Sequence, residues 1–264
     1  MGQNFLVDAG AAARIARLVL EIPADGPAAL PPGMRVLEIG AGTGQLTHAL
    51  IEAGAAVTVI DVDADMVRIL QSRSELDPAR IEHADALRFD YARFAGSEPW
   101  RVAGNLPYNI ATPLIMNLIA MSGGPEILVV MVQKDVADRF VAKPATPAYG
   151  SLSVAVQYAM HVERAFSLGP HVFFPRPKVQ STVVRLTRRE RPAAAVRNEQ
   201  WFLQVVRGAF AYRRKTLANS LALALGLQRD SVARALQTLQ LDTEIRGEQL
   251  GLADFARVAD ALGA

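Results

Sequence analysis

Cysteine is absent from all 264 residues of the chain. Its absence excludes disulfide frameworks, thiolate zinc sites and cysteine nucleophiles, and it fits a reducing compartment. Long apolar runs are missing as well, because the longest, I-L-V-V-M-V at residues 127–132, is far shorter than the roughly 18 residues of a membrane-spanning helix. The opening M-G-Q-N-F lacks a charged and then apolar signal pattern. We therefore expect a cytoplasmic protein without membrane association.

Patterns for metal and nucleoside triphosphate binding are also missing. The four histidines show no metal-ligand spacing, so no metal site is expected. No glycine loop is followed by Lys and then Ser or Thr, which disfavours a nucleoside triphosphatase. What the chain does contain, 51% hydrophobic and 20% charged residues, can bury a large core and excludes wholesale disorder.

Basic residues are concentrated in one part of the chain. Residues 176–215 hold eleven Lys and Arg against two acids, whereas the whole chain has a net charge of only +2. Such a local excess suggests a polyanionic partner, with nucleic acid favoured over a membrane. A solvated basic surface is the alternative, and charge alone does not separate the two.

Short β-rich segments alternate with helical ones up to about residue 187. Strands are expected at residues 35–39, 57–60, 80–82, 101–103, 127–132 and 182–186, and helices at 45–53, 64–72, 113–121 and 152–160. This alternation predicts an α/β fold with a mostly parallel sheet covered on both faces. After a linker-like R-P-A-A-A, helices are expected at residues 200–211, 215–223, 231–239 and 252–262. We therefore predict two domains, residues 1–190 and 191–264.

A glycine loop, G-A-G-T-G at residues 40–44, follows the first predicted strand and precedes a helix. Glycines there allow a tight turn and let a ligand approach the helix N-terminus. A dinucleotide fingerprint would need glycine at position 45, which is Gln45, whereas G-x-G-x-G matches the S-adenosylmethionine pattern. Asp61 ends the second strand, where it can accept both ribose hydroxyls, and Asp85 can accept from an adenine amino group. Together these features favour a nucleotide-like cofactor over an ordinary turn.

The sequence N-L-P-Y at residues 105–108 follows the fourth strand, about sixty residues after the glycine loop. It belongs to the N-P-P-[YF] type of loop found in enzymes that methylate exocyclic amines of nucleobases. Adenine N6 is a poor nucleophile, because its lone pair is delocalised. The Asn105 side-chain oxygen and the carbonyl of Leu106 or Pro107 can accept its two hydrogens and stabilise the developing positive charge. Pro107 fixes the loop, and Tyr108 offers a face to an extruded base.

These motifs, with several others, make the chain resemble the ribosomal RNA adenine N6,N6-dimethyltransferase family, and within it the bacterial 16S branch. The resemblance covers nearly the whole sequence. The matching segments are G-Q-N-F-L at residues 2–6, V-L-E-I-G-A-G-T-G at 36–44, N-L-P-Y-N-I-A-T-P at 105–113, V-Q-K-D-V at 132–136, Y-G-S-L-S at 149–153, F-F-P-R-P-K-V-Q-S at 173–181 and A-F-A-Y-R-R-K-T-L at 209–217.

The resemblance implies a Rossmann-like class I methyltransferase domain with a small C-terminal helical domain. The implied reaction transfers methyl groups from S-adenosylmethionine to N6 of two adjacent adenines near the 3′ end of 16S rRNA, within the assembling small subunit. A monomer is expected. By resemblance, Phe173 closes on the face of the base opposite Tyr108. The residues expected at the cofactor are Asn4, Leu6, Gly40, Gly42, Asp61, Asp85 and Asn105, and those expected at RNA are Arg207, Arg213, Arg214 and Lys215.

Two departures from the family pattern stand out. The family usually has a basic segment ahead of G-Q-N-F-L, whereas this chain begins at Met1, and the ribose acid is often Glu where this chain has Asp61.

Two alternatives also stay open. One is a 23S rRNA adenine methyltransferase of the macrolide-resistance type, and the other is a non-catalytic ribosome-assembly or transcription factor that retains the fold. Residues 149–153 and 173–181 fit the 16S branch better, and intact Asn105, Tyr108, Asp61 and Asp85 favour retained catalysis.

Overall fold

The computed structural model describes residues 4–23, 33–73, 77 and 80–263, without the side chains of Tyr108 and Asn109. Its strands are β1 (Phe5–Leu6), β2 (Arg35–Ile39), β3 (Ala56–Asp61), β4 (Ile81–His83), β5 (Trp100–Asn105), β6 (Ile127–Gln133), β7 (Met160–Leu168), β8 (Phe173–Phe174) and β9 (Ser181–Arg188). Its α-helices are α1 (Ala9–Leu20), α2 (Gln45–Glu52), α3 (Ala64–Gln71), α4 (Tyr91–Ala95), α5 (Tyr108–Ala120), α6 (Lys134–Phe140), α7 (Ser151–Ala159), α8 (Glu199–Ala211), α9 (Leu217–Leu225), α10 (Arg229–Thr238) and α11 (Leu252–Leu262).

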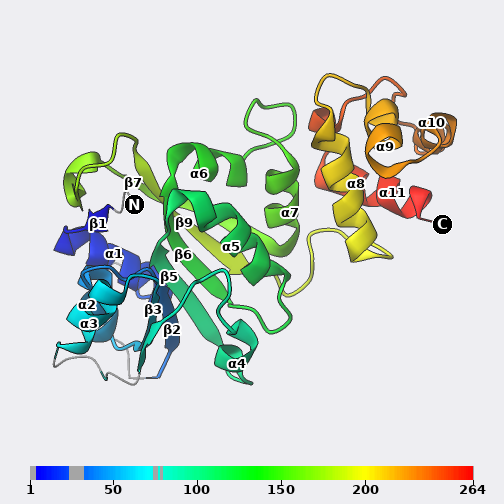
Figure 1. Ribbon diagram of the computed structural model, residues 1–264. Coiled ribbons are helices and arrows are strands. Elements are labelled where there is room, and N and C mark those ends of the chain that lie inside the picture. The colour runs from blue at the N-terminus through cyan, green and yellow to red at the C-terminus, as the bar shows by residue number, and fades with distance from the viewer. Residues whose placement is uncertain (1–3, 24–32, 74–76, 78–79, 264) are drawn as a thin grey trace. The chain divides into compact units, whose positions relative to one another are not determined.

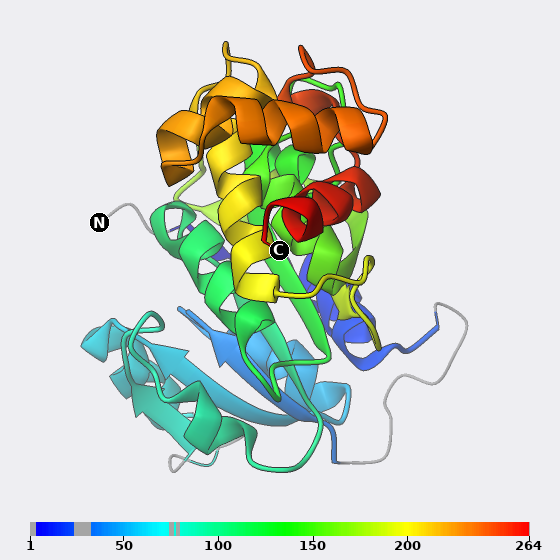
Figure 2. The same ribbon diagram turned by 90° about the vertical axis from the view of Figure 1, so that its right-hand side faces the viewer.

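A seven-stranded sheet organises the first unit, in the order β4-β3-β2-β5-β6-β9-β7. Strands β4, β3, β2, β5 and β6 run parallel, and β9 is antiparallel to β6. Helices α1 and α2 lie on one face of the sheet and α5 on the other (Figures 1 and 2). The predicted mostly parallel sheet with both faces covered is confirmed. Chain order reverses between β2 and β5, where open α/β sheets bind their ligands at the carboxyl ends of the strands.

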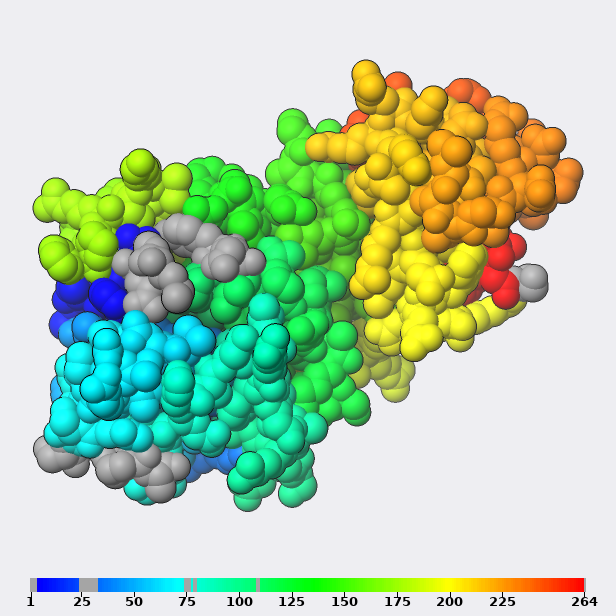
Figure 3. Space-filling model, in the orientation of Figure 1, coloured from blue at the N-terminus to red at the C-terminus, as the bar shows by residue number. Residues whose placement is uncertain are grey.

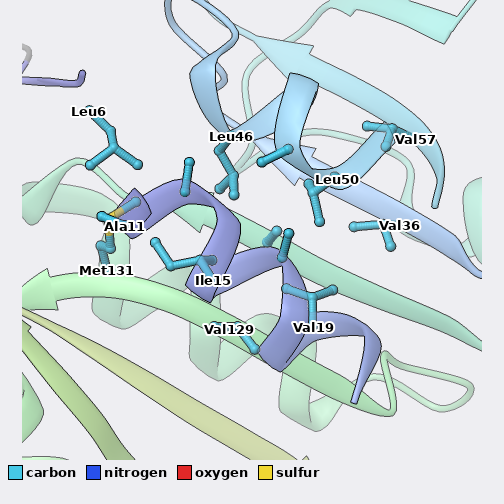
Figure 4. Packing of buried hydrophobic residues seen from close by; sticks show 14 of the residues in the cluster. Leu6, Ala11, Ile15, Val19, Val36, Leu46, Leu50, Val57, Val129 and Met131 are labelled. Carbon is cyan, nitrogen blue, oxygen red and sulfur yellow. The ribbon is translucent and has the colours of Figure 1, made fainter. Parts of the chain in front are cut away.

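Apolar side chains from α1, α2 and the sheet form a continuous core (Figure 4). Ile15 and Val19 of α1 meet Leu50 of α2 and Val36 and Val129 of the sheet, and all five are at most 1% exposed. Full burial of such a side chain stabilises the fold by about 1.5–3 kcal/mol. This core fixes β2 and β5 beneath the helices and so positions the loops at their carboxyl ends.

Helix α5 begins earlier than the sequence analysis predicts. The sequence predicts a helix over residues 113–121. The helix instead begins at Tyr108, because the Pro107 carbonyl already accepts hydrogen bonds from the backbone N–H groups of Ile110 (3.1 Å) and Ala111 (3.0 Å). Pro113 therefore lies inside the helix.

The second unit comprises residues 138–161 and 189–264. Within it, α8 to α11 lie together (Figure 2), and Phe202, Leu221 and Phe255 are fully buried in a common core. Tyr149 and Tyr158 belong to the same core, and the Tyr149 hydroxyl donates to the Leu250 carbonyl at 2.9 Å. The longer segment of this unit begins at residue 189, close to the predicted boundary at 190. Residues 138–161 also belong to this unit, whereas the sequence predicts them in the first domain.

Candidate functional site

The glycine loop leaves β2 in a conformation that only glycine adopts easily. Gly40 and Gly42 have φ angles of 72° and 54°, in the left-handed region that side chains disfavour. A Cβ on Gly42 would also lie 2.5 Å from the ring of Phe5. The bare backbone at Gly42 therefore makes room for the N-terminal strand, which packs directly on the loop.

Asp61 at the end of β3 holds this loop in place. Its side chain is buried and accepts a hydrogen bond from the backbone N–H of Gly42 at Oδ2 (3.0 Å) and from Asp63 at Oδ1 (2.9 Å). A carboxylate can accept about four hydrogen bonds, so two of its acceptor positions remain. Asp61 therefore combines a loop-holding contact with capacity to accept a ligand hydroxyl.

Asp85 lies beside Asp61 because β4 pairs with β3. The N–H of Ala84 donates to the Asp61 carbonyl at 2.9 Å, which fixes the chain just before Asp85. The Asp85 side chain is half exposed, and its Oδ1 accepts from the N–H of Leu87 at 2.9 Å. The two acids thus follow neighbouring strands. This is the arrangement that the sequence predicts for a ligand with ribose hydroxyls near Asp61 and an adenine amino group near Asp85.

Asn105, at the end of β5, is tied to the N-terminal segment. Its Nδ2 donates to the backbone carbonyl of Asn4 at 2.6 Å. This contact uses the amide nitrogen and leaves Oδ1 as the acceptor end of the side chain. Two sequence motifs a hundred residues apart therefore meet here, and the N-terminal one orients the side chain of the other.

The three residues after Asn105 occupy different environments. Leu106 is buried, whereas Pro107 is exposed. The Pro107 carbonyl accepts the first hydrogen bonds of α5, but no backbone N–H among the described residues donates to the Leu106 carbonyl. Of the two candidate carbonyls, that of Leu106 is therefore the one that accepts no backbone hydrogen bond from a described residue. The backbone of Tyr108 begins α5, but its side chain lies outside the description.

Strand β8 brings Phe173 next to the N-terminal segment. It pairs antiparallel with β1, with Phe5 opposite Phe174 and Leu6 opposite Phe173. Phe173 is only 3% exposed and packs in the core of the first unit, whereas Phe174 is 70% exposed. Phe173 is therefore a core residue of the first unit, and it does not line the pocket described next.

A pocket lies at the carboxyl ends of β2 and β5. It joins four of the predicted cofactor residues, Leu6, Gly40, Gly42 and Asn105, with Phe5, Glu38, Ala41, Gln45, Leu46 and Met131. Asn4 and Asp61 adjoin it through their hydrogen bonds to Asn105 and Gly42. Asp85 does not line it.

Glu38 is the pocket residue that the sequence analysis missed. Its side chain is 1% exposed, and its Oε2 has no hydrogen-bond partner among the described residues. The pKa of Glu38 is raised to about 8. Burial is the largest cause, Thr47 acts in the opposite direction, and the nearby Asp61 carboxylate adds to the rise. Its signal was an acid within the apolar strand V-L-E-I, a position that is costly unless the acid has a partner.

The predicted RNA-contacting residues lie in the second unit, on α8 and in the turn between α8 and α9. Arg207, Arg213, Arg214 and Lys215 are all exposed. Arg213 lies 3.6 Å from a carboxylate oxygen of Glu248. Arg214 and Lys215 form no ion pair with any residue that the structure describes.

The described residues form neither a cluster of potential metal ligands nor a membrane-spanning helix. In the described ranges, no three potential ligands among His, Cys, Asp and Glu gather as a metal site would require. Of the predicted non-ligand histidines, His48 pairs with Glu52 at 3.2 Å, His83 contacts the Val62 carbonyl, and His161 contacts Arg189. His171 lies in the 3-10 helix Pro170–Val172. Across the same ranges, every helix is too short or too polar to cross a membrane.

Comparison with known proteins extends this description. The family model for ribosomal RNA adenine dimethylase matches residues 1–262. The ribosomal RNA small subunit methyltransferase A of Hahella chejuensis is 42% identical, over 98% of this chain and 90% of that protein. Its counterpart in Pseudomonas aeruginosa is 41% identical, over 99% and 92%.

Two solved structures share the fold. A dimethyladenosine transferase from Plasmodium falciparum matches with a TM-score of 0.72 and 23% identity, over 96% of this chain and 95% of that one. A 23S rRNA methyltransferase matches with a TM-score of 0.70 and 25% identity, over 99% and 100%. The predicted Rossmann-like class I methyltransferase fold is confirmed.

Proposed function

Because the chain belongs to the ribosomal RNA adenine dimethylase family, we propose that it dimethylates N6 of two adjacent adenines near the 3′ end of 16S rRNA. The observation that carries this proposal is the meeting of Asn105 with the N-terminal segment and the glycine loop in one pocket. The chain is an S-adenosylmethionine-dependent enzyme. Its substrate is ribosomal RNA, and we place its action in the cytoplasm, on the assembling small subunit, as a monomer.

The residues present fit S-adenosylmethionine. The left-handed backbone at Gly40 and Gly42 lines the pocket, and Asp61 has acceptor capacity beyond its two bonds to backbone N–H groups. The partnerless Oε2 of Glu38 adds a buried acceptor in the pocket, as a ligand with an ammonium group requires. When bound, the cofactor supplies a methyl group on a sulfonium. The residues that would hold it are Asn4, Leu6, Gly40, Gly42, Asp61, Asp85 and Asn105.

Asn105 and Leu106 act on the target amine. Oδ1 of Asn105 accepts one N6 hydrogen, and the Leu106 carbonyl accepts the other. These contacts draw N6 towards tetrahedral geometry and stabilise the positive charge that develops on it. Because the bond from Nδ2 to the Asn4 carbonyl orients Oδ1 in advance, little reorganisation is needed at the moment of reaction.

Other residues position the target adenine. None of them needs to act as a strong proton acceptor. Pro107 fixes the loop, Tyr108 stacks on one face of the extruded adenine, and Phe173 closes the other side. The alkylated ammonium is acidic and releases its proton to water.

The two parts of the chain divide the work in this proposal. Residues 1–190 bind the cofactor and carry out catalysis, and residues 191–264 bind RNA. The exposed side chains of Arg207, Arg213, Arg214 and Lys215 support the second assignment, because phosphate contacts need accessible cations.

A 23S rRNA methyltransferase remains the second candidate, because one such enzyme shares the fold at 25% identity. The small-subunit relatives are closer, at 42% and 41% identity. Tritiated cofactor, offered with immature small subunits or with 23S rRNA, tests both candidates. We expect label in 16S rRNA only. Label in 23S rRNA would favour the second candidate, and no label would favour a non-catalytic role.

A further inference from the structure

The ring of Phe174 is the most exposed large apolar side chain among the described residues, at 70%. Single exposed apolar residues are common and need no explanation by themselves. Phe174 differs because of where it stands, which the pairing of β8 with β1 determines.

Cross-strand partners in an antiparallel pair project to the same face. Phe174 is paired with Phe5, whose ring packs over Gly42 of the glycine loop. Leu6 and Phe173 project to the opposite face and are buried in the core. Phe174 therefore shares a face of the ladder with Phe5, which lines the pocket. The segment from β7 to β8 lies beside the N-terminal strand on the surface of the first unit (Figure 3).

Two cations accompany this ring. Arg176 and Lys178 follow Phe174 at alternate positions, and both are exposed. Within the described part of the chain, no acid pairs with either side chain. They are separated by the buried Pro177, which together with Pro175 restricts the backbone. An exposed aromatic ring flanked by unpaired cations is the composition that proteins use to bind single-stranded nucleic acid.

The proposed reaction unstacks RNA bases, and an exposed aromatic ring can stack on such bases. An adenine must leave its stack to reach the Asn105 loop, so the base next to it loses a stacking neighbour. Stacking on an aromatic ring is worth ~1–3 kcal/mol per base. A protein partner would explain the exposed ring too, but it would not explain the cations beside a site that acts on RNA.

We propose that Phe174 stacks on an unpaired base of the ribosomal RNA adjacent to the target adenine, while Arg176 and Lys178 contact the phosphates beside it. This inference rests on the proposed function, and it assigns RNA contact to the first unit in addition to the basic turn of the second.

Binding of a fluorescently labelled 16S rRNA fragment, with its two adjacent adenines unpaired, tests the inference without requiring methyl transfer. Phe174→Ala should raise the Kd for RNA by roughly 5-fold to 150-fold. Phe174→Tyr keeps the ring and should bind within about twofold of wild type. Ile69→Ala, which trims another exposed apolar side chain of the same unit, should not change the Kd.

Salt dependence separates stacking from charge. Phe174→Ala should keep the wild-type log–log salt slope, whereas the double variant Arg176→Ala with Lys178→Ala should flatten it by roughly 1.4 to 1.8 units. Thermal unfolding and the Kd for S-adenosylmethionine should stay unchanged in every variant, because the altered side chains are exposed.

An unchanged Kd in Phe174→Ala, or an equal loss in Phe174→Tyr, overturns the inference. If wild-type protein binds the fragment but methylates no small subunit, only the proposed function fails. The Kd of Phe174→Ala relative to wild type still decides the role of Phe174. Wild-type protein that does not bind RNA overturns both.

Discussion

Replacing Asn105 by Ala should abolish most methyl transfer while cofactor binding falls much less. The substitution removes Oδ1, which we place on an N6 hydrogen in the transition state. A hydrogen-bonding group at a developing charge is worth about 3–4 kcal/mol, so kcat should fall roughly 10²- to 10³-fold. Nδ2 also loses its 2.6 Å bond to the Asn4 carbonyl. A single hydrogen bond contributes about 1 kcal/mol, so the Kd for S-adenosylmethionine should rise only about fivefold.

Single-turnover transfer to immature small subunits, at saturating RNA and cofactor, measures the first effect, and calorimetry measures the second. Asn105→Asp is the matched control, because it keeps an acceptor oxygen at the Oδ1 position but loses the donor to Asn4. It should retain more activity than the Ala variant. An Ala variant with a rate within about tenfold of wild type, or with parallel losses in rate and cofactor affinity, would refute the acceptor role.

Three further variants test the roles of Asp61, Glu38 and the basic turn. Asp61→Ala should raise the Kd for S-adenosylmethionine by about 100-fold or more in calorimetry, because two ribose hydroxyls lose a charged acceptor, and an unchanged Kd would rule that contact out. Glu38 has its pKa raised by burial to about 8, so the folded state holds a proton that the unfolded state releases above about pH 4.5. The contribution of Glu38 to the free energy of unfolding should therefore be fully present below that pH and fall by up to about 1.4 kcal/mol per pH unit until about pH 8. In denaturant titrations Glu38→Gln should flatten this decline, and a variant with the wild-type slope would contradict the assignment. Replacing Arg213, Arg214 and Lys215 by Ala should flatten the salt slope of RNA binding by roughly two to three units, whereas lost thermal stability with an unchanged slope would mean a structural role.

The central strands and the long C-terminal helices could be predicted from sequence because their apolar patterns are local. The two-residue strands β1 and β8 could not, since two residues carry no periodicity and each forms only by pairing with the other. The same limit applies to Phe173 and Phe174. Adjacent strand residues face opposite sides, and only the pairing register shows that Phe173 is the buried one.

The motifs of the candidate site could be predicted from the sequence. The hydrogen bonds that join these motifs could not. Asn105 and Asp61 stood out because strand ends in a parallel sheet converge at one edge. The hydrogen bond between Asn105 and Asn4 joins residues far apart in sequence, so no spacing rule could reveal it. Glu38 stood out in the sequence only as an acid within an apolar strand, and its partnerless oxygen in the pocket shows that it belongs to the site.

The most direct test of the central claim is to locate the methyl groups. Immature small subunits are incubated with the enzyme and S-adenosylmethionine, and their RNA is digested and mapped by mass spectrometry. The account predicts N6,N6-dimethyladenosine at two adjacent positions near the 3′ end of 16S rRNA, and none after Asn105→Ala. Methylation at a single adenine elsewhere, on another atom, or equally in the variant would contradict it.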